Sequence, residues 1–292
     1  MKLNYINCTA HGSSEGNLLI GDERAALFDC GMAFCAGETV RNVKNALGAK
    51  TLDYIFITHT HYDHAGALPF FREAWPELRL VTCGIGAAAL LKDTPRRVIR
   101  ELSHVAAKRY GGRVEPYSDG ALRADIIIKD GDSVPLGGFS VKAVETPGHT
   151  KDSLSYFIPE AELFILSEST GVFLPGADSI HSAYLSSYGD TVRSFEKCRR
   201  EPYKYLSLPH RGIFGQSKEE ADRFFEEALA ETAACRDFIL DMHAQGLGED
   251  RMLDLFTEKY ANETRMRFQP EEAFAINARA VIACTLRERE VC

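Results

Sequence analysis

Short apolar runs alternate with glycine-rich polar turns along the chain as far as about residue 215. The run Tyr54-Ile55-Phe56-Ile57-Thr58 is typical of a buried strand, and Leu27-Phe28-Asp29 indicates the end of an earlier strand, followed by a loop through Gly31 and Gly37. Helical spacing predicts helices at about 86–110, closed by Gly111-Gly112, and at about 190–199. Further strands are predicted at Asp125–Ile128, Phe139–Glu145, Ser153–Ile158, Leu163–Leu166 and Tyr205–Leu208. This alternation predicts an α/β fold.

After Gly215 the pattern becomes helical throughout. Ser217-Lys218-Glu219-Glu220 has the form of a capping box and predicts the start of a long helix. A second helix is expected at about 250–260, and a third from Pro270 to the C-terminus. The chain is therefore predicted to have an α/β part at 1–215 and an all-helical part at 216–292.

A cluster of possible metal ligands follows the strand at 54–58, in the sequence His59-Thr60-His61-Tyr62-Asp63-His64. The chain has nine histidines and three of them fall in this window, which argues against a polar loop with chance histidines. On extended backbone His59 and His61 point to the same side, and Asp63 and His64 follow as the chain turns into a helix. Imidazole and carboxylate ligands suit Zn²⁺, Fe²⁺ or Mn²⁺, and ligands gather at strand ends in layered α/β folds.

The spacing His-x-His-x-Asp-His after a buried strand resembles the metallo-β-lactamase superfamily. Three later features of that family also have counterparts here: a Gly-His-Thr turn at His149, a late histidine after a strand at His210, and an early aspartate that braces the metal loop at Asp29. The resemblance spans roughly residues 18–212. It implies a four-layer αββα sandwich, with 1–215 as the catalytic domain and a C-terminal helical extension at 216–292 that caps the active site.

By this resemblance the chain would bind two divalent metal ions, Zn, Fe or Mn. One would be held by His59, His61 and His149, and the other by Asp63, His64 and His210. The family usually bridges the two ions with an aspartate that follows a strand, whereas this chain carries Glu168 at that place. The longer side chain leaves metal identity and occupancy of the second site open. A surface carboxylate in a turn is the alternative interpretation of Glu168, although an unpaired carboxylate in a buried strand context is costly.

Two neighbouring metal ions lower the pKa of a bridging water, so that hydroxide is available at neutral pH, and they polarise a carbonyl or phosphoryl oxygen of the substrate. By the resemblance, Asp63 would both bind metal and orient the hydroxide, and it is the predicted catalytic residue. No side-chain nucleophile is required, so we expect the cysteines to be structural.

Composition and charge narrow the function classes. Hydrophobic residues make up 45% and charged residues 26%, as in ordinary soluble proteins, and the net charge of −8 disfavours a nucleic-acid or membrane partner. The N-terminus has no signal-peptide pattern, and no apolar run is long enough to span a membrane. The cysteines form no CxxC pair, which indicates reduced thiols and a cytoplasmic location, and they lie at Cys8, Cys30, Cys35, Cys83, Cys198, Cys235, Cys284 and Cys292. We expect a small-molecule substrate, with a homodimer as one possible assembly.

Several branches of the superfamily fit less well. The acidic balance disfavours the nucleases, the missing signal peptide disfavours secreted lactamases, and the flavodiiron branch carries a glutamate where this chain has His61. Thioesterases of the glyoxalase II type, lactonases, phosphodiesterases and mononuclear-iron persulfide dioxygenases remain. The layout, including the segment 87–110, Lys151-Asp152 and the C-terminal helices, is most similar to the quinolone-signal-response thioesterases within the glyoxalase II-like branch.

The leading hypothesis is therefore a metal-dependent hydrolase of a small ester or thioester, a thioesterase or esterase. One alternative is a mononuclear-iron persulfide or thiol oxygenase, and another is a non-catalytic regulatory protein that retains the metal fold. Tyr184, Tyr188 and His181 are candidate substrate-binding residues in the loop at 171–189, which is equally consistent with a compact surface loop.

Overall fold

A computed structural model describes residues 4–177, 179–215 and 217–289. The chain divides into two compact units. The first comprises Met1–Glu145 and Leu154–Ile165, and the second comprises Thr146–Ser153 and Leu166–Cys292. The structure thus places residues 166–215 in the same compact unit as the helical region. The division into a catalytic domain at 1–215 and a helical extension at 216–292 stays a prediction.

The first sheet of the first unit has the strand order β1-β2-β3-β4-β5-β6. The first three strands pair antiparallel, and β3 to β6 run parallel. Leu27 of β3 is in register with Ile55 of β4, which places the residues after these strands at one edge of the sheet. The strands are β1 (Tyr5–Asn7), β2 (Asn17–Ile20), β3 (Ala25–Phe28), β4 (Tyr54–Phe56), β5 (Arg79–Thr82) and β6 (Ile126–Ile127).

Four antiparallel strands of the same unit form a second layer, β7 (Ser133–Pro135), β8 (Ser140–Glu145), β9 (Leu154–Ile158) and β10 (Leu163–Ile165). Tyr156 joins this layer to the first sheet, because its ring packs 5.6 Å from Phe28 and 5.3 Å from Phe56, centroid to centroid. Its hydroxyl donates a hydrogen bond to the Ile57 carbonyl at 2.6 Å. The end of the strand that leads to the histidine cluster is thus held against the second layer.

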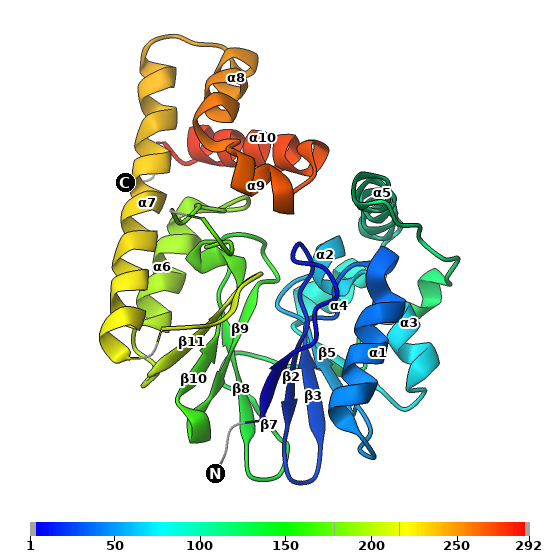
Figure 1. The fold of residues 1–292 in the computed structure, drawn as a ribbon. Coiled ribbons are helices and arrows are strands. Elements are labelled where there is room, and N and C mark those ends of the chain that lie inside the picture. The colour runs from blue at the N-terminus through cyan, green and yellow to red at the C-terminus, as the bar shows by residue number, and fades with distance from the viewer. Residues whose placement is uncertain (1–3, 178, 216, 290–292) are drawn as a thin grey trace. The chain divides into compact units, whose positions relative to one another are not determined.

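Helices lie along the first sheet on its other side (Figure 1). Val40, Val43 and Leu47 of α1 are buried at helical spacing, so this helix packs its apolar stripe into the core. The helical segments are η1 (Ala33–Cys35), α1 (Ala36–Leu47), α2 (Tyr62–Ala65), α3 (Leu68–Ala74), α4 (Gly84–Leu90), α5 (Asp93–Tyr110), η2 (Asp119–Ala121) and η3 (Pro159–Ala161).

The second unit is mostly helical. Its strands β11 (Tyr205–Leu208) and β12 (Gly212–Phe214) pair antiparallel, and the long helix α7 contacts both α6 and β11. Helices α7, α8 and α10 are labelled in Figure 1. They share an apolar core that includes Phe256 and Phe274. The helical segments are η4 (Glu168–Thr170), α6 (Tyr188–Cys198), α7 (Lys218–Ala244), α8 (Glu249–Tyr260), α9 (Glu263–Phe268) and α10 (Glu271–Arg287).

Each predicted strand has a counterpart in the structure, whereas the strands β1, β2, β5, β7 and β12 were not predicted. The helices differ from the prediction at three places. The stretch after Asp29 was expected to be a loop because of its glycines. It contains α1 instead, whose buried residues Val40, Val43 and Leu47 recur at helical spacing. The single helix expected at 86–110 is two, α4 and α5, because Pro95 has no amide hydrogen to donate and therefore lies in the first turn of a new helix. The short helix α9 was not predicted. The predicted capping box is confirmed, since Ser217 Oγ accepts a hydrogen bond from the Glu220 amide at 3.3 Å.

The described cysteines are all free thiols, as expected, and Cys292 lies outside the described residues. Burial raises the pKa of Cys8, Cys235 and Cys284 to about 11, which makes these thiols poor nucleophiles. Within the part of the chain that the structure describes, every helix is too short or too polar to cross a membrane.

Candidate metal centre

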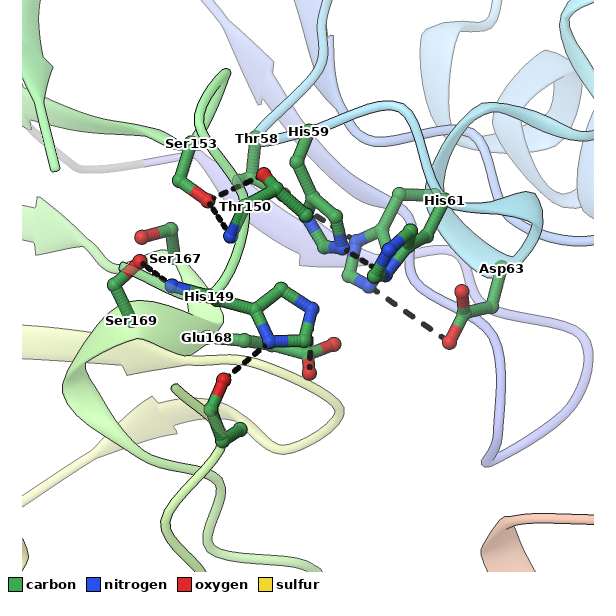
Figure 2. Close-up of polar contacts among 12 residues, drawn as sticks. Thr58, His59, His61, Asp63, His149, Thr150, Ser153, Ser167, Glu168 and Ser169 are labelled. Carbon is green, nitrogen blue, oxygen red and sulfur yellow. Dashed lines mark hydrogen bonds and ion pairs between the residues drawn. The ribbon is translucent and has the colours of Figure 1, made fainter. Parts of the chain in front are cut away.

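The first group of predicted ligands lies in the first unit, where β4 ends (Figure 2). His59 is buried and His61 is the last extended residue before α2. His59 Nε2 and His61 Nδ1 are 2.9 Å apart, so the two imidazoles converge as the alternation of the strand predicted. The Leu154 amide donates to the Thr58 carbonyl at 2.7 Å, which fixes the start of this loop on the second layer.

Asp29 makes the hydrogen bonds expected of a residue that braces this loop. The carboxylate is 2% exposed and accepts hydrogen bonds from the Thr58 amide at 2.7 Å and from the Thr58 hydroxyl at 2.9 Å. Its Oδ2 lies 2.9 Å from His64 Nδ1, so Nδ1 carries the proton and His64 has an unprotonated Nε2. That Nε2 is 3.9 Å from Asp63 Oδ2.

Thr58 orients a second imidazole, although the sequence did not single it out. Its hydroxyl donates to Asp29 and lies 3.0 Å from His59 Nδ1, so it can accept the Nδ1 proton of that ring. The same reasoning then gives His59 an unprotonated Nε2. A threonine between a strand and a histidine pair is too common to identify this role from sequence alone.

The second group of predicted ligands lies in the second unit (Figure 2). His149 follows Gly148, which has a φ of 141° and thereby allows the turn into the ring's position. The His149 amide donates to Ser169 Oγ at 3.0 Å, and its Nδ1 donates to the Ala183 carbonyl at 2.6 Å. In the neutral ring this bond leaves the lone pair on Nε2, which lies 3.4 Å from Glu168 Oε2.

Glu168 stands between two imidazoles of this unit. Its Oε1 is 3.0 Å from Nε2 of His210, and Oε2 faces His149. The carboxylate is 8% exposed at the start of η4, so the surface-turn interpretation is wrong. His210 occupies the turn between β11 and β12 with a φ of 58°, a backbone conformation that few non-glycine residues adopt and that is enriched at functional sites.

These donor sets fit divalent metal ions. Candidate ligand atoms of His59 and His61, of Asp63 and His64, and of Glu168 and His210 lie within 4.8 Å of each other in each pair. Buried imidazoles with defined tautomers and partly buried carboxylates are the ligands that Zn²⁺ and Fe²⁺ take in proteins. The geometry within each unit therefore suits metal binding, whereas the assignment of ligands to two shared ions stays a prediction.

The three candidate substrate-binding residues have different surroundings. Tyr184 is fully buried, with its hydroxyl 2.9 Å from Thr285 Oγ1 in the helical core, and burial raises its pKa well above the ordinary value. Tyr188 begins α6, and its ring packs edge-on at 5.3 Å from that of Tyr184. His181 is also buried, and burial together with the charge of Arg265 lowers its pKa to about 4. Contact of any of the three with substrate stays a prediction.

Proteins of similar sequence align with only part of this chain. A rubredoxin-oxygen oxidoreductase from Megalodesulfovibrio gigas is 24% identical over 68% of this chain and 42% of its own length. A hydroxyacylglutathione hydrolase from Hahella chejuensis is 33% identical over 37% of this chain and 28% of its own length. The chain thus spans less than half the length of either relative.

The fold also matches solved structures. A metallo-beta-lactamase family protein from Thermus thermophilus superposes with a TM-score of 0.65 over 99% of this chain and 93% of that one, at 17% identity. The predicted metallo-β-lactamase sandwich with a C-terminal helical region is confirmed. The model of the metallo-beta-lactamase superfamily matches residues 17–210, a range that holds all seven predicted metal ligands. The chain belongs to the metallo-beta-lactamase superfamily.

Proposed function

We propose that this protein is a metal-dependent hydrolase that cleaves a small ester or thioester. The observation that carries the proposal is the bonding of the histidine rings. Asp29 and the Ala183 carbonyl each accept the Nδ1 proton of a histidine, which leaves the Nε2 lone pairs of His64 and His149 for a metal. The similarity to a hydroxyacylglutathione hydrolase supports ester or thioester chemistry.

In this proposal the seven predicted ligands would hold two metal ions. His59, His61 and His149 would bind the first. Asp63, His64 and His210 would bind the second, and Glu168 would bridge them. The two imidazoles beside the Glu168 carboxylate support the bridging role, because one oxygen faces each ring.

When bound, the metal pair supplies hydroxide at neutral pH and polarises the carbonyl oxygen of the substrate. Asp63 would orient the attacking water, because a carboxylate can accept a hydrogen bond from it through one oxygen. The side chain of Asp63 is 17% exposed, so a water can reach it, whereas that of His64 beside it is buried. Asp29 would keep the His64 ring in its orientation throughout the reaction.

Turnover of a generic thioester by the metal-loaded protein tests this function. Substitution His61→Ala should lower the rate by at least a hundredfold, and His149→Ala should do the same. His104→Ala is the matched control, because this histidine is exposed on α5. Unchanged rates in both ligand variants, or no turnover of any ester, thioester or phosphodiester by the wild-type protein, would contradict the proposal.

A second candidate function is oxygen chemistry at iron. The similarity to a rubredoxin-oxygen oxidoreductase over 68% of this chain favours it, whereas the imidazole of His61 favours the hydrolase, because the flavodiiron pattern has a glutamate there. Iron-loaded protein that consumes O₂ in the presence of a thiol or persulfide, without hydrolysing esters, would support this second candidate. Ester hydrolysis without O₂ uptake would exclude it.

A further inference from the structure

Two arginines meet at one buried tyrosine where the parallel strands of the first sheet begin. Tyr54 is the first residue of β4 and is 2% exposed. Its hydroxyl oxygen accepts a hydrogen bond from Arg79 Nη2 at 2.6 Å and another from Arg24 Nη1. The guanidinium carbons of Arg79 and Arg24 are 4.7 and 5.6 Å from the centroid of the Tyr54 ring. Two hydrogen bonds to one atom keep the two donor nitrogens within about 6 Å of each other.

The pairing of the strands explains why these side chains converge. Arg79 is the first residue of β5 and lies directly beside Tyr54. Ala26 of β3 lies beside Tyr54 on the other side, and Arg24 is two residues before Ala26. Side chains at paired positions, and at alternate positions of one strand, project from the same face of a sheet. The backbone of Arg24 is fixed as well, because its amide donates to the Leu136 carbonyl at 3.0 Å.

Neither arginine is neutralised by an acid. Both residues are exposed, and among residues 4–177, 179–215 and 217–289 no carboxylate oxygen lies within 4.0 Å of either guanidinium group. Asp53 precedes Tyr54 directly, but its Oδ2 accepts the Ala25 amide at 2.9 Å. Like charges held this close repel each other, and an anion bound to both would replace the repulsion by attraction.

Most of the donors in this group remain available to a ligand. A guanidinium has five N–H donors, and toward the described residues Arg24 and Arg79 each use their side chain only for the bond to Tyr54. Because the tyrosine already holds both groups in place, a ligand would have less side-chain freedom to remove on binding. Lys50 adds positive charge at the turn that leads to Arg24, since its Nζ donates to the Gly21 carbonyl at 2.6 Å.

We propose that Arg24, Arg79 and Tyr54 form a binding site for the phosphate group of a small soluble molecule. Two guanidinium groups match the several oxygens and the double charge of a phosphate better than the two oxygens and single charge of a carboxylate. The net charge of −8 opposes a nucleic acid or an anionic membrane as the source of the phosphate.

The proposed phosphate site is separate from the candidate metal centre. Tyr54 begins β4, whereas His59 follows the end of this strand, and extended chain between them spans roughly 16 Å. The site is therefore a second binding function of the first unit, and it does not depend on the proposed hydrolase activity.

Titration of inorganic phosphate into the metal-depleted full chain, followed by calorimetry at constant ionic strength and a pH of about 8, tests the site without catalysis or metal. Phosphate should bind, and acetate should bind at least tenfold more weakly. Arg24→Met and Arg79→Met should each weaken phosphate binding at least tenfold, and Arg79→Lys by a smaller factor because the charge remains. Arg97→Met is the matched control, since this exposed arginine of α5 pairs with Glu101 at 3.8 Å and should leave binding unchanged.

Tyr54→Phe tests the arrangement of the arginines separately from their charge. The variant retains the buried ring and both guanidinium groups but lacks the oxygen on which they meet. Phosphate affinity should fall by about three- to tenfold. Thermal unfolding gives a second measurement, because a ligand that binds only the folded state stabilises it. Phosphate should raise the Tm of the wild-type protein and of Arg97→Met, and it should not raise that of the double variant Arg24→Met, Arg79→Met.

Equal binding of phosphate and acetate by the wild-type protein would overturn the inference, and so would unchanged phosphate affinity in both arginine-to-methionine variants. Tighter binding to phosphatidylserine vesicles than to phenyl phosphate would overturn the choice of a soluble ligand. If a methionine variant fails to fold, the comparison of phosphate with acetate on the wild-type protein and on Arg79→Lys still decides. Phosphate binding by a wild-type protein that hydrolyses no ester or thioester would support this site and contradict only the proposed function.

Discussion

Asp29 offers the most informative single substitution, Asp29→Asn. The carboxylate accepts hydrogen bonds from the Thr58 amide and hydroxyl and from His64 Nδ1, at 2.7, 2.9 and 2.9 Å. Asn is the right replacement because the residue has a φ of 57°, which asparagine tolerates better than alanine does. The variant retains the backbone conformation and one acceptor oxygen, and it presents an amide N–H₂ where the second oxygen was.

The expected cost follows from these bonds. An amide hydrogen facing His64 Nδ1 forces the proton of that ring onto Nε2, the atom that would bind metal. Loss of such an orienting partner weakens metal binding about 10–100-fold, or about 1.4–2.7 kcal/mol. Replacing charge-assisted hydrogen bonds by neutral ones should also lower the free energy of unfolding by about 2 kcal/mol.

Competition with a chromophoric chelator measures the metal affinity, and urea unfolding of the metal-free protein measures the stability. Asp53→Asn is the control. Asp53 lies just before β4, at the opposite end of this strand from the histidines, and its Oδ2 accepts a hydrogen bond from the Ala25 amide at 2.9 Å. If Asp29→Asn folds and binds metal as tightly as the wild-type protein does, Asp29 does not orient the ligands and the reasoning fails.

Three further outcomes are expected. Gly148→Ala should lower stability by about 1–3 kcal/mol and reduce metal affinity, because its Cβ would come within 2.7 Å of Thr191 Cα; unfolding curves and chelator competition check this. The pKa of His181 falls from 6.5 to about 4 on folding, so the unfolded chain binds more protons between these values. Stability should therefore rise with pH across that window, by at most about 3 kcal/mol. An equally steep rise in His181→Leu would contradict this. Tyr184→Phe removes the hydroxyl bonded to Thr285 and should cost about 1 kcal/mol of unfolding free energy without affecting metal affinity, whereas lost metal affinity would give Tyr184 a role in the site.

The histidine cluster could be predicted because its spacing and its strand are local properties of the sequence. A buried run such as 54–57 fixes a strand, and alternation then fixes the common direction of His59 and His61. Glu168 could also be predicted as a ligand, because it follows a strand. In the structure its side chain is buried between two imidazoles.

Residues that act through tertiary contacts could not be found in this way. Thr58 and Ser169 orient histidines through single hydrogen bonds, and serine or threonine near a turn carries no distinctive pattern. Arg24 and Arg79 look like ordinary charged residues where strands begin, and only the pairing of β3, β4 and β5 brings them together on Tyr54. Tyr184 illustrates the converse, because an aromatic residue in a long loop proved to be part of the helical core.

Metal content tests the central claim most directly. Protein purified without oxygen and reconstituted with Zn²⁺, Fe²⁺ or Mn²⁺ should contain about two metal ions per chain by elemental analysis. The ratio should fall to about one or less in Glu168→Ala and His149→Ala, and it should stay unchanged in the control His104→Ala. A wild-type chain that remains free of metal after reconstitution with each ion, or an unchanged ratio in both ligand variants, would contradict the account.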